Sequence, residues 1–199
     1  RNKIEIAELD VIIISHLHGD HFGGLPFILL DTIQNLRAKD LRIIGPPGVE
    51  EKTWALFDLM YPGSAKSIQK DKIVFESYNS LEEISFGDIK LVAYPVIHTA
   101  EVNPHGLRLA IDDKIISYSG DTEWCANLVP LASGADLFIC ECNFLEKEVK
   151  GHLNYRTMVD HIHILDCKNI LLTHLGDDML TNRNIVTLPI AKEGMVFTI

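Results

Sequence analysis

The most constraining feature of this 199-residue chain is a cluster of four potential metal ligands within six residues. The cluster reads His16-Leu17-His18-Gly19-Asp20-His21 and follows the apolar run Val11–Ser15, which predicts a β-strand. Alternate side chains of an extended segment share a face, so His16 and His18 can point at one ion. After the turn at Gly19, Asp20 and His21 can point at a second ion. A packed core has no use for so many adjacent titratable groups, so the cluster favours a metal site over a structural role.

Apolar runs rich in β-forming residues alternate with helical patterns along the whole chain, with no internal repeat and no low-complexity linker. This alternation predicts a layered α/β fold, and the length favours one domain over residues 1–199 with one substantial core. The predicted strands are Val11–Ser15, Leu41–Ile44, Lys72–Ser77, Lys90–Val96, Leu107–Asp112, Ile115–Ser119, Leu137–Glu141, Ile170–Thr173 and Met195–Ile199. The predicted helices are Leu25–Arg37, Val49–Met60 and Tyr155–Leu165, and turns are expected at Gly87-Asp88 and Asp112-Asp113.

Three further metal-binding side chains each follow a predicted strand: His98, Asp121 and His174. Strand ends that meet at one edge of a sheet are where α/β folds place their ligand sites. We therefore expect two metal ions, the first held by His16, His18 and His98, the second by Asp20, His21 and His174, with Asp121 bridging both.

Histidine nitrogens combined with carboxylate oxygens suit Zn²⁺, with Mn²⁺ or Fe²⁺ as alternatives. Two adjacent divalent ions can share a water molecule, lower its pKa and clamp the attacking and leaving oxygens. The seven-ligand set therefore predicts a hydrolase, in which Asp20 is also expected to orient the attacking hydroxide.

At these residues the sequence resembles the metallo-β-lactamase fold superfamily, whose His-x-His-x-Asp-His motif is matched by His16 to His21. The single ligands follow in the family's order, in Val96-Ile97-His98, Ser119-Gly120-Asp121-Thr122 and Leu172-Thr173-His174. The resemblance implies an αβ/βα sandwich with the site at one edge. Because few residues precede the first motif, the N-terminal strands of that fold are expected to be missing.

Within the superfamily, Cys140-Glu141-Cys142-Asn143-Phe144 and Gly151-His152-Leu153-Asn154 look like the glutamate and histidine of the ribonuclease Z-like branch. The resemblance implies that His152 protonates the leaving oxygen and that Glu141 orients the His152 side chain. A carboxylate beside a histidine raises the histidine's pKa, which suits proton donation near neutral pH. The alternative is that Glu141 pairs with another cation and His152 caps the helix that begins near Asn154.

The tRNA-processing enzymes of this branch carry a long arm between the third metal motif and the bridging aspartate. Here that interval holds His105-Gly106-Leu107-Arg108 and a predicted hairpin ending at Ser119, which leaves no room for an arm. The formal net charge of −10 also disfavours long nucleic acid as a substrate. We therefore expect a small phosphodiester substrate, cleaved by a hydroxide that bridges the two ions.

Two other functions stay open from the sequence alone. The same ion pair could hydrolyse an ester, thioester or lactone, and tRNA 3′-end processing is the alternative within the resembling branch. A redox di-iron protein or a non-catalytic binding module on the same fold is disfavoured, because redox relatives use a glutamate where this chain has His18 and because all seven ligands are present.

The remaining composition favours a cytoplasmic enzyme. There is no apolar run of membrane-spanning length and no secretory leader at the start of the sequence. The four cysteines do not form a spaced zinc pattern and are expected to be reduced thiols, mostly in the core. A homodimer is implied only by the frequency of dimers in the resembling family.

Several other polar and aromatic residues are weaker candidates for the site. His105 and Arg108 could reach the substrate but are explained as well by strand packing, and His161 and His163 face different directions on one predicted helix. Thr122 and Asn143 could support the proposed ligands by hydrogen bonds, whereas Trp124 and Phe144 are expected to pack in the core or the rim rather than to bind a base.

Overall fold

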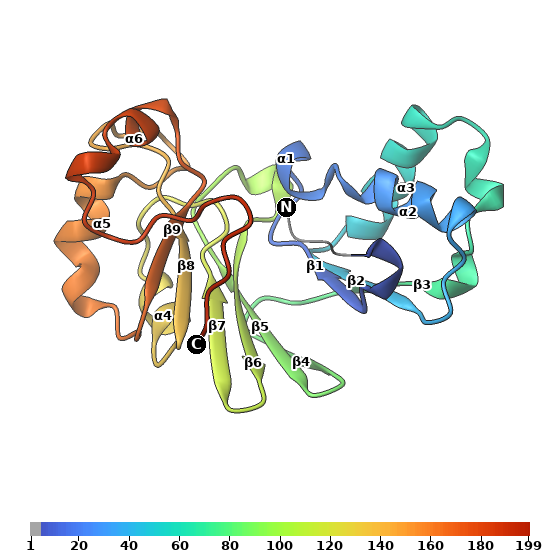
Figure 1. Ribbon diagram of the computed structural model, residues 1–199, viewed down its shortest axis with the longest axis horizontal. Helices are drawn as coiled ribbons and strands as arrows, with labels where there is room; N and C mark the ends of the chain where they lie inside the picture. The colour runs from blue at the N-terminus through green and yellow to red at the C-terminus, as the bar shows by residue number, and fades with distance from the viewer. Residues whose placement is uncertain (1–4) are drawn as a thin grey trace. The chain divides into compact units, whose positions relative to one another are not determined.

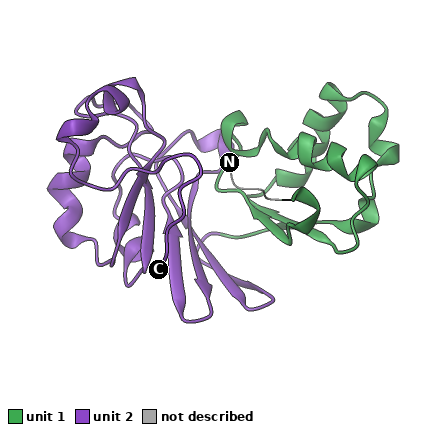
Figure 2. Cartoon of the chain, viewed as in Figure 1, with its two compact units in different colours: residues 1–79 green, residues 80–199 purple. Residues whose placement is uncertain are grey.

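The computed structural model describes residues 5–199 and divides the chain into two compact units, residues 1–79 and residues 80–199 (Figure 2). Each unit has a β-sheet and a core of its own. The single domain over residues 1–199 stays a prediction.

Unit 1 is built around a parallel three-stranded sheet in the order β1-β2-β3 (Figure 1). Helices α2 and α3 connect the strands, as parallel pairing requires. Its core consists of large aliphatic and aromatic side chains that are fully buried, such as Leu29, Ile43 and Phe57. The elements of unit 1 are η1 Ile6–Glu8, β1 Val11–Ile13, α1 Gly19–Phe22, α2 Leu25–Gln34, β2 Leu41–Gly45, α3 Val49–Met60, η2 Ser64–Ser67, η3 Lys70–Lys72 and β3 Ile73–Ser77.

Unit 2 is built around a six-stranded sheet in the order β4-β5-β6-β7-β8-β9 (Figure 1). Strands β4 to β7 pair antiparallel, whereas β7, β8 and β9 pair parallel. The elements of unit 2 are β4 Glu83–Phe86, β5 Ile89–Pro95, η4 Ala100–Val102, β6 His105–Ile111, β7 Lys114–Tyr118, α4 Leu128–Ala132, β8 Leu137–Glu141, α5 Tyr155–His161, η5 Ile162–Ile164, β9 Ile170–Thr173, α6 Asp177–Thr181 and η6 Arg183–Ile185.

The core of unit 2 joins the parallel half of the sheet to its helices. Leu131 of α4, Phe138 of β8, Met158 of α5 and Met179 of α6 are all fully buried in one cluster. This cluster fixes α4, α5 and α6 against β8 and β9, and so fixes the loops that follow these strands.

The structure confirms most of the predicted elements and corrects some bounds. Strands β8 and β9 and helix α3 have the predicted bounds, and turns lie at Gly87-Asp88 and Asp112-Asp113 between paired strands. The predicted strand Met195–Ile199 is wrong, because these residues have no regular secondary structure. Strand β4 and the short helices α1, α4 and α6 were not predicted.

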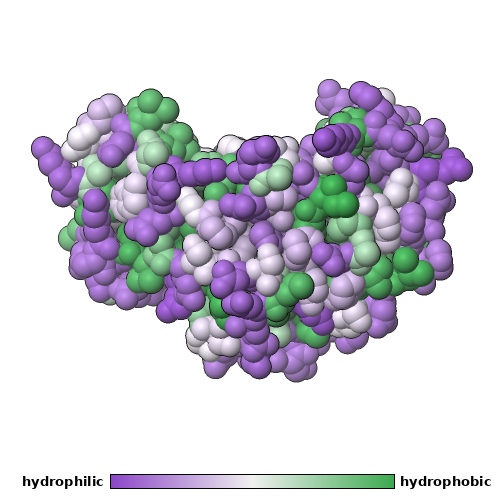
Figure 3. All heavy atoms as spheres, turned by 180° about the vertical axis from the view of Figure 1, so that it is seen from behind, coloured by the Kyte–Doolittle hydropathy of each residue, from purple (hydrophilic) through white to green (hydrophobic). Residues whose placement is uncertain are grey.

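Large apolar side chains are not confined to the two cores. On the face drawn in Figure 3, hydrophobic patches lie among hydrophilic residues. Phe27, Leu36 and Leu59 of unit 1 and Val196 of unit 2 are among the exposed apolar side chains. Such exposure is ordinary in folded proteins and by itself indicates no binding surface. None of the helices within residues 5–199 has both the length and the apolarity needed to span a bilayer.

Candidate metal centre

The candidate residues of unit 2 gather where strands of its sheet end. Asp121 follows β7, Glu141 is the last residue of β8, and His174 follows β9. These strands are parallel, so their carboxyl ends lie at one edge of the sheet. His98 follows β5, which runs in the same direction as β7 because both pair antiparallel with β6. The sheet therefore brings four predicted site residues to one edge.

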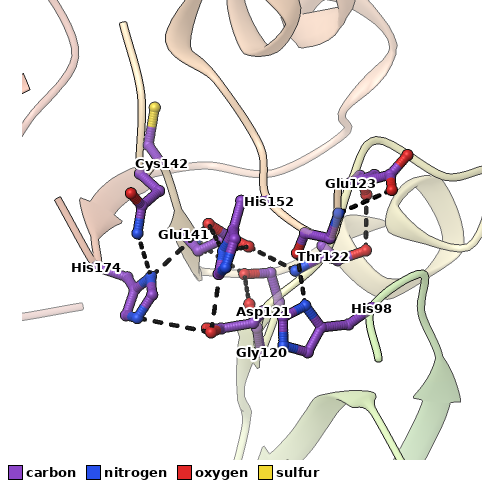
Figure 4. Close-up of polar contacts among 12 residues, drawn as sticks. His98, Gly120, Asp121, Thr122, Glu123, Glu141, Cys142, His152 and His174 are labelled. Atoms are coloured by element: carbon purple, nitrogen blue, oxygen red, sulfur yellow. Dashed lines mark hydrogen bonds and ion pairs between the residues drawn. The ribbon is translucent and has the colours of Figure 1, made fainter. Parts of the chain in front are cut away.

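Asp121, Glu141, His152 and His174 form a connected group in unit 2 (Figure 4). Nδ1 of His152 lies 3.2 Å from Oε1 of Glu141 and 4.0 Å from Oδ2 of Asp121. Nε2 of His174 lies 3.5 Å from the same Asp121 oxygen. The Asp121 side chain is only 2% exposed and that of Glu141 is fully buried, so solvent screens these charges little.

Glu141 is held as the partner of His152. Its carboxylate accepts a hydrogen bond from the backbone N–H of Thr122, and its own backbone N–H donates to Oγ of Ser119 at 2.8 Å. The hydrogen bond that His152 donates to Glu141 raises the pKa of His152, and burial of the ring opposes this only in part. Glu141 therefore pairs with His152, as predicted. In the alternative interpretation His152 caps the next helix, but that cap is Asn154, whose side chain accepts from the N–H of Thr157.

His98 is oriented by the segment that carries His152. Nδ1 of His98 lies 2.7 Å from the carbonyl oxygen of Gly151, and because a carbonyl can only accept, Nδ1 carries the proton. The lone pair is therefore on Nε2, the tautomer that a metal-binding imidazole needs. The rings of His98 and His152 lie 5.0 Å apart.

One short segment, Thr122-Glu123, connects the loops that carry the two histidines. Oγ1 of Thr122 accepts from the backbone N–H of Ile97 at 3.1 Å, and the N–H of Glu123 donates to the carbonyl of Ile97 at 2.9 Å. The Glu123 carboxylate accepts from the N–H of Gly151 at 2.8 Å. These contacts fix the residues next to His98 and His152 relative to Asp121. Neither Glu123 nor Gly151 was among the predicted site residues.

His174 has a backbone conformation that is unusual for a residue with a side chain, with φ of +54°. Such conformations cost energy and are common at functional sites. Its Nδ1 lies 3.0 Å from the side-chain amide nitrogen of Asn143. Because an amide has both a donor and an acceptor, rotation of the Asn143 side chain would let its oxygen accept from Nδ1 when Nε2 binds a cation.

The four-ligand motif of unit 1 lies on the segment from β1 into helix α1. Tyr78 holds this segment, since its hydroxyl donates to the carbonyl oxygens of Ile14 and Ser15 at 2.9 and 3.0 Å. The ring of His16 lies 5.2 Å from that of His18 and 3.9 Å from that of His21. The imidazole groups of this motif are therefore gathered, and Asp20 lies 3.5 Å from Nε2 of His21.

The donor sets of both units fit divalent metal ions. Within unit 2, ligand atoms of His98, Asp121 and His152 lie within 4.8 Å of one another, as do those of Glu141, His152 and His174. All are imidazole nitrogens or carboxylate oxygens, the donors that Zn²⁺, Mn²⁺ and Fe²⁺ accept. The structure thus gathers the predicted ligands within each unit.

The weaker candidates have local structural roles. Nε2 of His105 lies 2.8 Å from the hydroxyl of Ser80, and burial lowers the pKa of this histidine. Arg108 donates to the carbonyl of Leu131 at 3.0 Å. His161 stacks on Trp124, with ring centroids 4.1 Å apart. The four cysteines are unbridged, and burial raises the pKa of the Cys142 thiol to about 12, so this thiol is unreactive at neutral pH.

Comparison with known proteins places the chain in a family. Residues 1–175 match the family described as the β-lactamase superfamily domain. The ribonuclease Z of Ignicoccus hospitalis is 27% identical to this chain over an alignment 224 residues long. The alignment covers 87% of this chain and 73% of that protein.

Two solved structures show the same fold. The metallo-β-lactamase fold protein YhfI from Bacillus subtilis has a TM-score of 0.75 and 22% identity, over 98% of this chain and 80% of that one. The short form of human tRNase Z has a TM-score of 0.73 and 19% identity, over 99% of this chain and 82% of that one. The predicted fold and the predicted class of metal-dependent hydrolase are confirmed. By its family match, its fold and its gathered histidines and aspartates, this chain belongs to the β-lactamase superfamily, as a hydrolase of the metallo-β-lactamase fold.

Proposed function

We propose that the chain is a phosphodiesterase that uses two divalent metal ions, with zinc as the expected metal and manganese or iron as alternatives. His16, His18 and His98 would hold one ion, Asp20, His21 and His174 the other, and Asp121 both. When bound, such ions activate water as a nucleophile and neutralise phosphoryl oxygens. The oxygen and nitrogen donors gathered within each unit support this assignment.

His152 supplies the proton that the leaving group needs. Its Nδ1 is turned to Glu141, which leaves Nε2 as the ring nitrogen that can donate to a substrate. Asp20 is assigned to orient the attacking water. Water adds its oxygen to phosphorus, the bond from phosphorus to the leaving oxygen breaks with its electron pair, and the proton of His152 goes to that oxygen. A proton from the attacking water restores the charge of His152.

One observation carries the choice of a phosphodiester: the Glu141–His152 pair lies directly beside Asp121. An alkoxide is a poor leaving group, so a histidine whose pKa is raised by a buried carboxylate is of most use where an alcohol must leave. The similarity to a protein named ribonuclease Z supports the same choice, because a ribonuclease cleaves phosphodiesters.

Among phosphodiesters, the chain fits a small substrate better than a long nucleic acid. The formal net charge of −10 repels a polyanion. The interval between His98 and Asp121 is filled by η4 and the β6–β7 hairpin. The ribonuclease Z names of the relatives, together with the tRNase Z of the solved human structure, keep tRNA 3′-end processing as the second candidate. A homodimer and a cytoplasmic location stay predictions.

The test compares two substrates that differ in their need for an acid. Cleavage of a 3′,5′-cyclic nucleotide expels an alkoxide, whereas bis-p-nitrophenyl phosphate expels a phenolate that needs little protonation. His152→Ala should lower kcat on the cyclic nucleotide by about 10² to 10⁴-fold, the usual contribution of a general acid, and should lower kcat on the aryl ester far less.

The matched control is His163→Ala, which removes an exposed histidine of η5 and should leave both rates unchanged. Metal-loaded protein that cleaves neither substrate would refute the phosphodiesterase. Equal losses on the two substrates would refute the role of His152 as the acid.

A further inference from the structure

A pocket of about 530 Å³ lies beside His152 within unit 2. It is lined by Glu123 and Trp124, by residues 148–150 and 152–154, and by Thr157 of α5. Its volume falls in the range of small-molecule sites. The pocket borders the proposed proton donor, and the residues that line it include none of the seven proposed metal ligands. A group in this pocket would therefore be next to the acid but away from the ions, which is where a leaving group must be.

The indole of Trp124 is a fixed wall of this pocket. The ring of His161 stacks on it with an interplanar angle of 25°. His161 is itself oriented, because its Nδ1 donates to the carbonyl oxygen of Thr157 at 2.8 Å. His161 covers one face of the indole, so a flat ligand in the pocket would contact the rest of a ring that is already held in place, at little entropic cost.

The part of the lining formed by residues 152–154 is also rigid. Leu153 is 1% exposed and Asn154 is 5% exposed. The tight turn before them is closed by the hydrogen bond from the N–H of His152 to the carbonyl of Val149, at 3.1 Å. Glu123 fixes the same turn by accepting from the N–H of Gly151. The pocket is therefore formed by residues that are held by packing and hydrogen bonds.

The charges of the lining determine which part of a phosphodiester fits. Glu123 and Glu148 contribute two carboxylates and Lys150 one ammonium group. With the imidazolium of His152 the lining carries two negative and two positive charges, so it has no net positive charge that would favour a phosphate group. Carboxylates accept hydrogen bonds from hydroxyl groups, and the indole accepts a planar ring. An uncharged group with hydroxyls and a flat ring, such as a nucleoside, has this chemistry.

We propose that this pocket binds the nucleoside of the leaving group, so that the substrate is a nucleotide phosphodiester. The proposal rests on the proposed function and adds the class of substrate. The nucleoside stacks against Trp124, and its leaving oxygen lies at His152, which protonates it.

The first experiment measures binding without catalysis. The chain has two tryptophans, so a Trp54→Phe variant reports Trp124 alone and a Trp124→Phe variant reports Trp54 alone. Adenosine added to metal-free Trp54→Phe protein should quench the fluorescence in a saturable way, and inorganic phosphate should not. In the Trp124→Phe protein adenosine should give no saturable quenching. Quenching that is linear in adenosine, or equal in the two variants, would overturn the proposal.

The second experiment measures selectivity. Trp124→Ala should lower kcat/KM on a dinucleoside monophosphate about tenfold more than on bis-p-nitrophenyl phosphate, the size of effect expected for one lost base stack. Trp54→Ala, in unit 1, should leave the ratio of the two values unchanged. Equal losses on both substrates in the Trp124 variant would overturn the pocket assignment. Protein that cleaves neither substrate but binds adenosine at Trp124 would refute the proposed function and leave the pocket standing.

Discussion

At the scale of single residues, Gly151 connects His98, a proposed metal ligand, with His152, the proposed proton donor. It precedes His152, its carbonyl accepts from His98, and its N–H donates to Glu123. Its φ is +84°, which L-residues rarely adopt. A Cβ at this position would lie 2.7 Å from Nδ1 of His98. Both the backbone angle and the close approach to His98 therefore require glycine.

Gly151→Ala should destabilise the protein and weaken metal binding. The strained backbone costs about 1–3 kcal/mol, and displacement of His98 adds to this. Gly134→Ala is the matched control, because Gly134 also has a positive φ, +66°, but a Cβ there would meet no atom within 4 Å. Urea unfolding with and without Zn²⁺ measures both effects. Equal losses of stability and zinc affinity in the two variants would show that the contact with His98 is unimportant.

The sequence was most informative about residues whose chemistry is rare in a protein core. The motif from His16 to His21 and the single ligands His98, Asp121 and His174 stand out by residue type and position, and the Glu141–His152 pair by resemblance. Glu123 and Gly151 could not be predicted, because each acts through hydrogen bonds to or from the backbone of Gly151 that exist only after distant loops meet. The one sequence signal for a special role of residue 151 is that a glycine directly precedes His152.

At the scale of elements, helix α5 determines where His152 can lie. The helix begins directly after the turn that carries this histidine, and Asn154 caps it by accepting from the N–H of Thr157 at 2.8 Å. Met158 of α5 is fully buried in the core cluster. The cap and this buried contact together anchor the segment from Gly151 to Asn154 to the sheet.

Asn154→Ala should lower the free energy of unfolding by about 1 kcal/mol, the usual cost of a lost N-cap. Asn154→Asp should restore most of that stability, since aspartate caps as well as asparagine and its charge suits a helix N-terminus. Both are compared with wild type by urea unfolding. An alanine variant as stable as wild type, or an aspartate variant as unstable as alanine, would contradict the capping role.

Elements were predictable where their pattern was long or fully apolar. Strands β8 and β9 are short apolar runs with clear ends, and α3 has helical spacing that ends at Tyr61-Pro62-Gly63. Helices α1, α4 and α6 are only four or five residues long and show no full helical period. Met195–Ile199 is an apolar run with β-branched and aromatic residues, as in many strands, yet no partner pairs with it among the described residues.

At the scale of the whole molecule, the chain divides into two compact units that the sequence did not predict. No change of composition and no proline- or glycine-rich stretch marks the boundary at Asn79 and Ser80. Four of the seven proposed ligands belong to unit 1 and three to unit 2. Since a zinc site usually needs three or four protein ligands, four ligands could complete a site within unit 1 and three a site within unit 2, whereas the proposed assignment gives each ion ligands from both units.

This division makes the proposed sharing of ions testable by metal content. If His16 and His98 hold the same ion, His16→Ala, His98→Ala and the double variant should each retain about one zinc per chain after dialysis, because the remaining ligands still form the other site. Combining His16→Ala with His174→Ala removes one ligand from each site and should leave almost none. His163→Ala should retain two. Elemental analysis of the purified variants measures this, and if each unit bound its own ion, the His16 and His98 double variant would lose both metals.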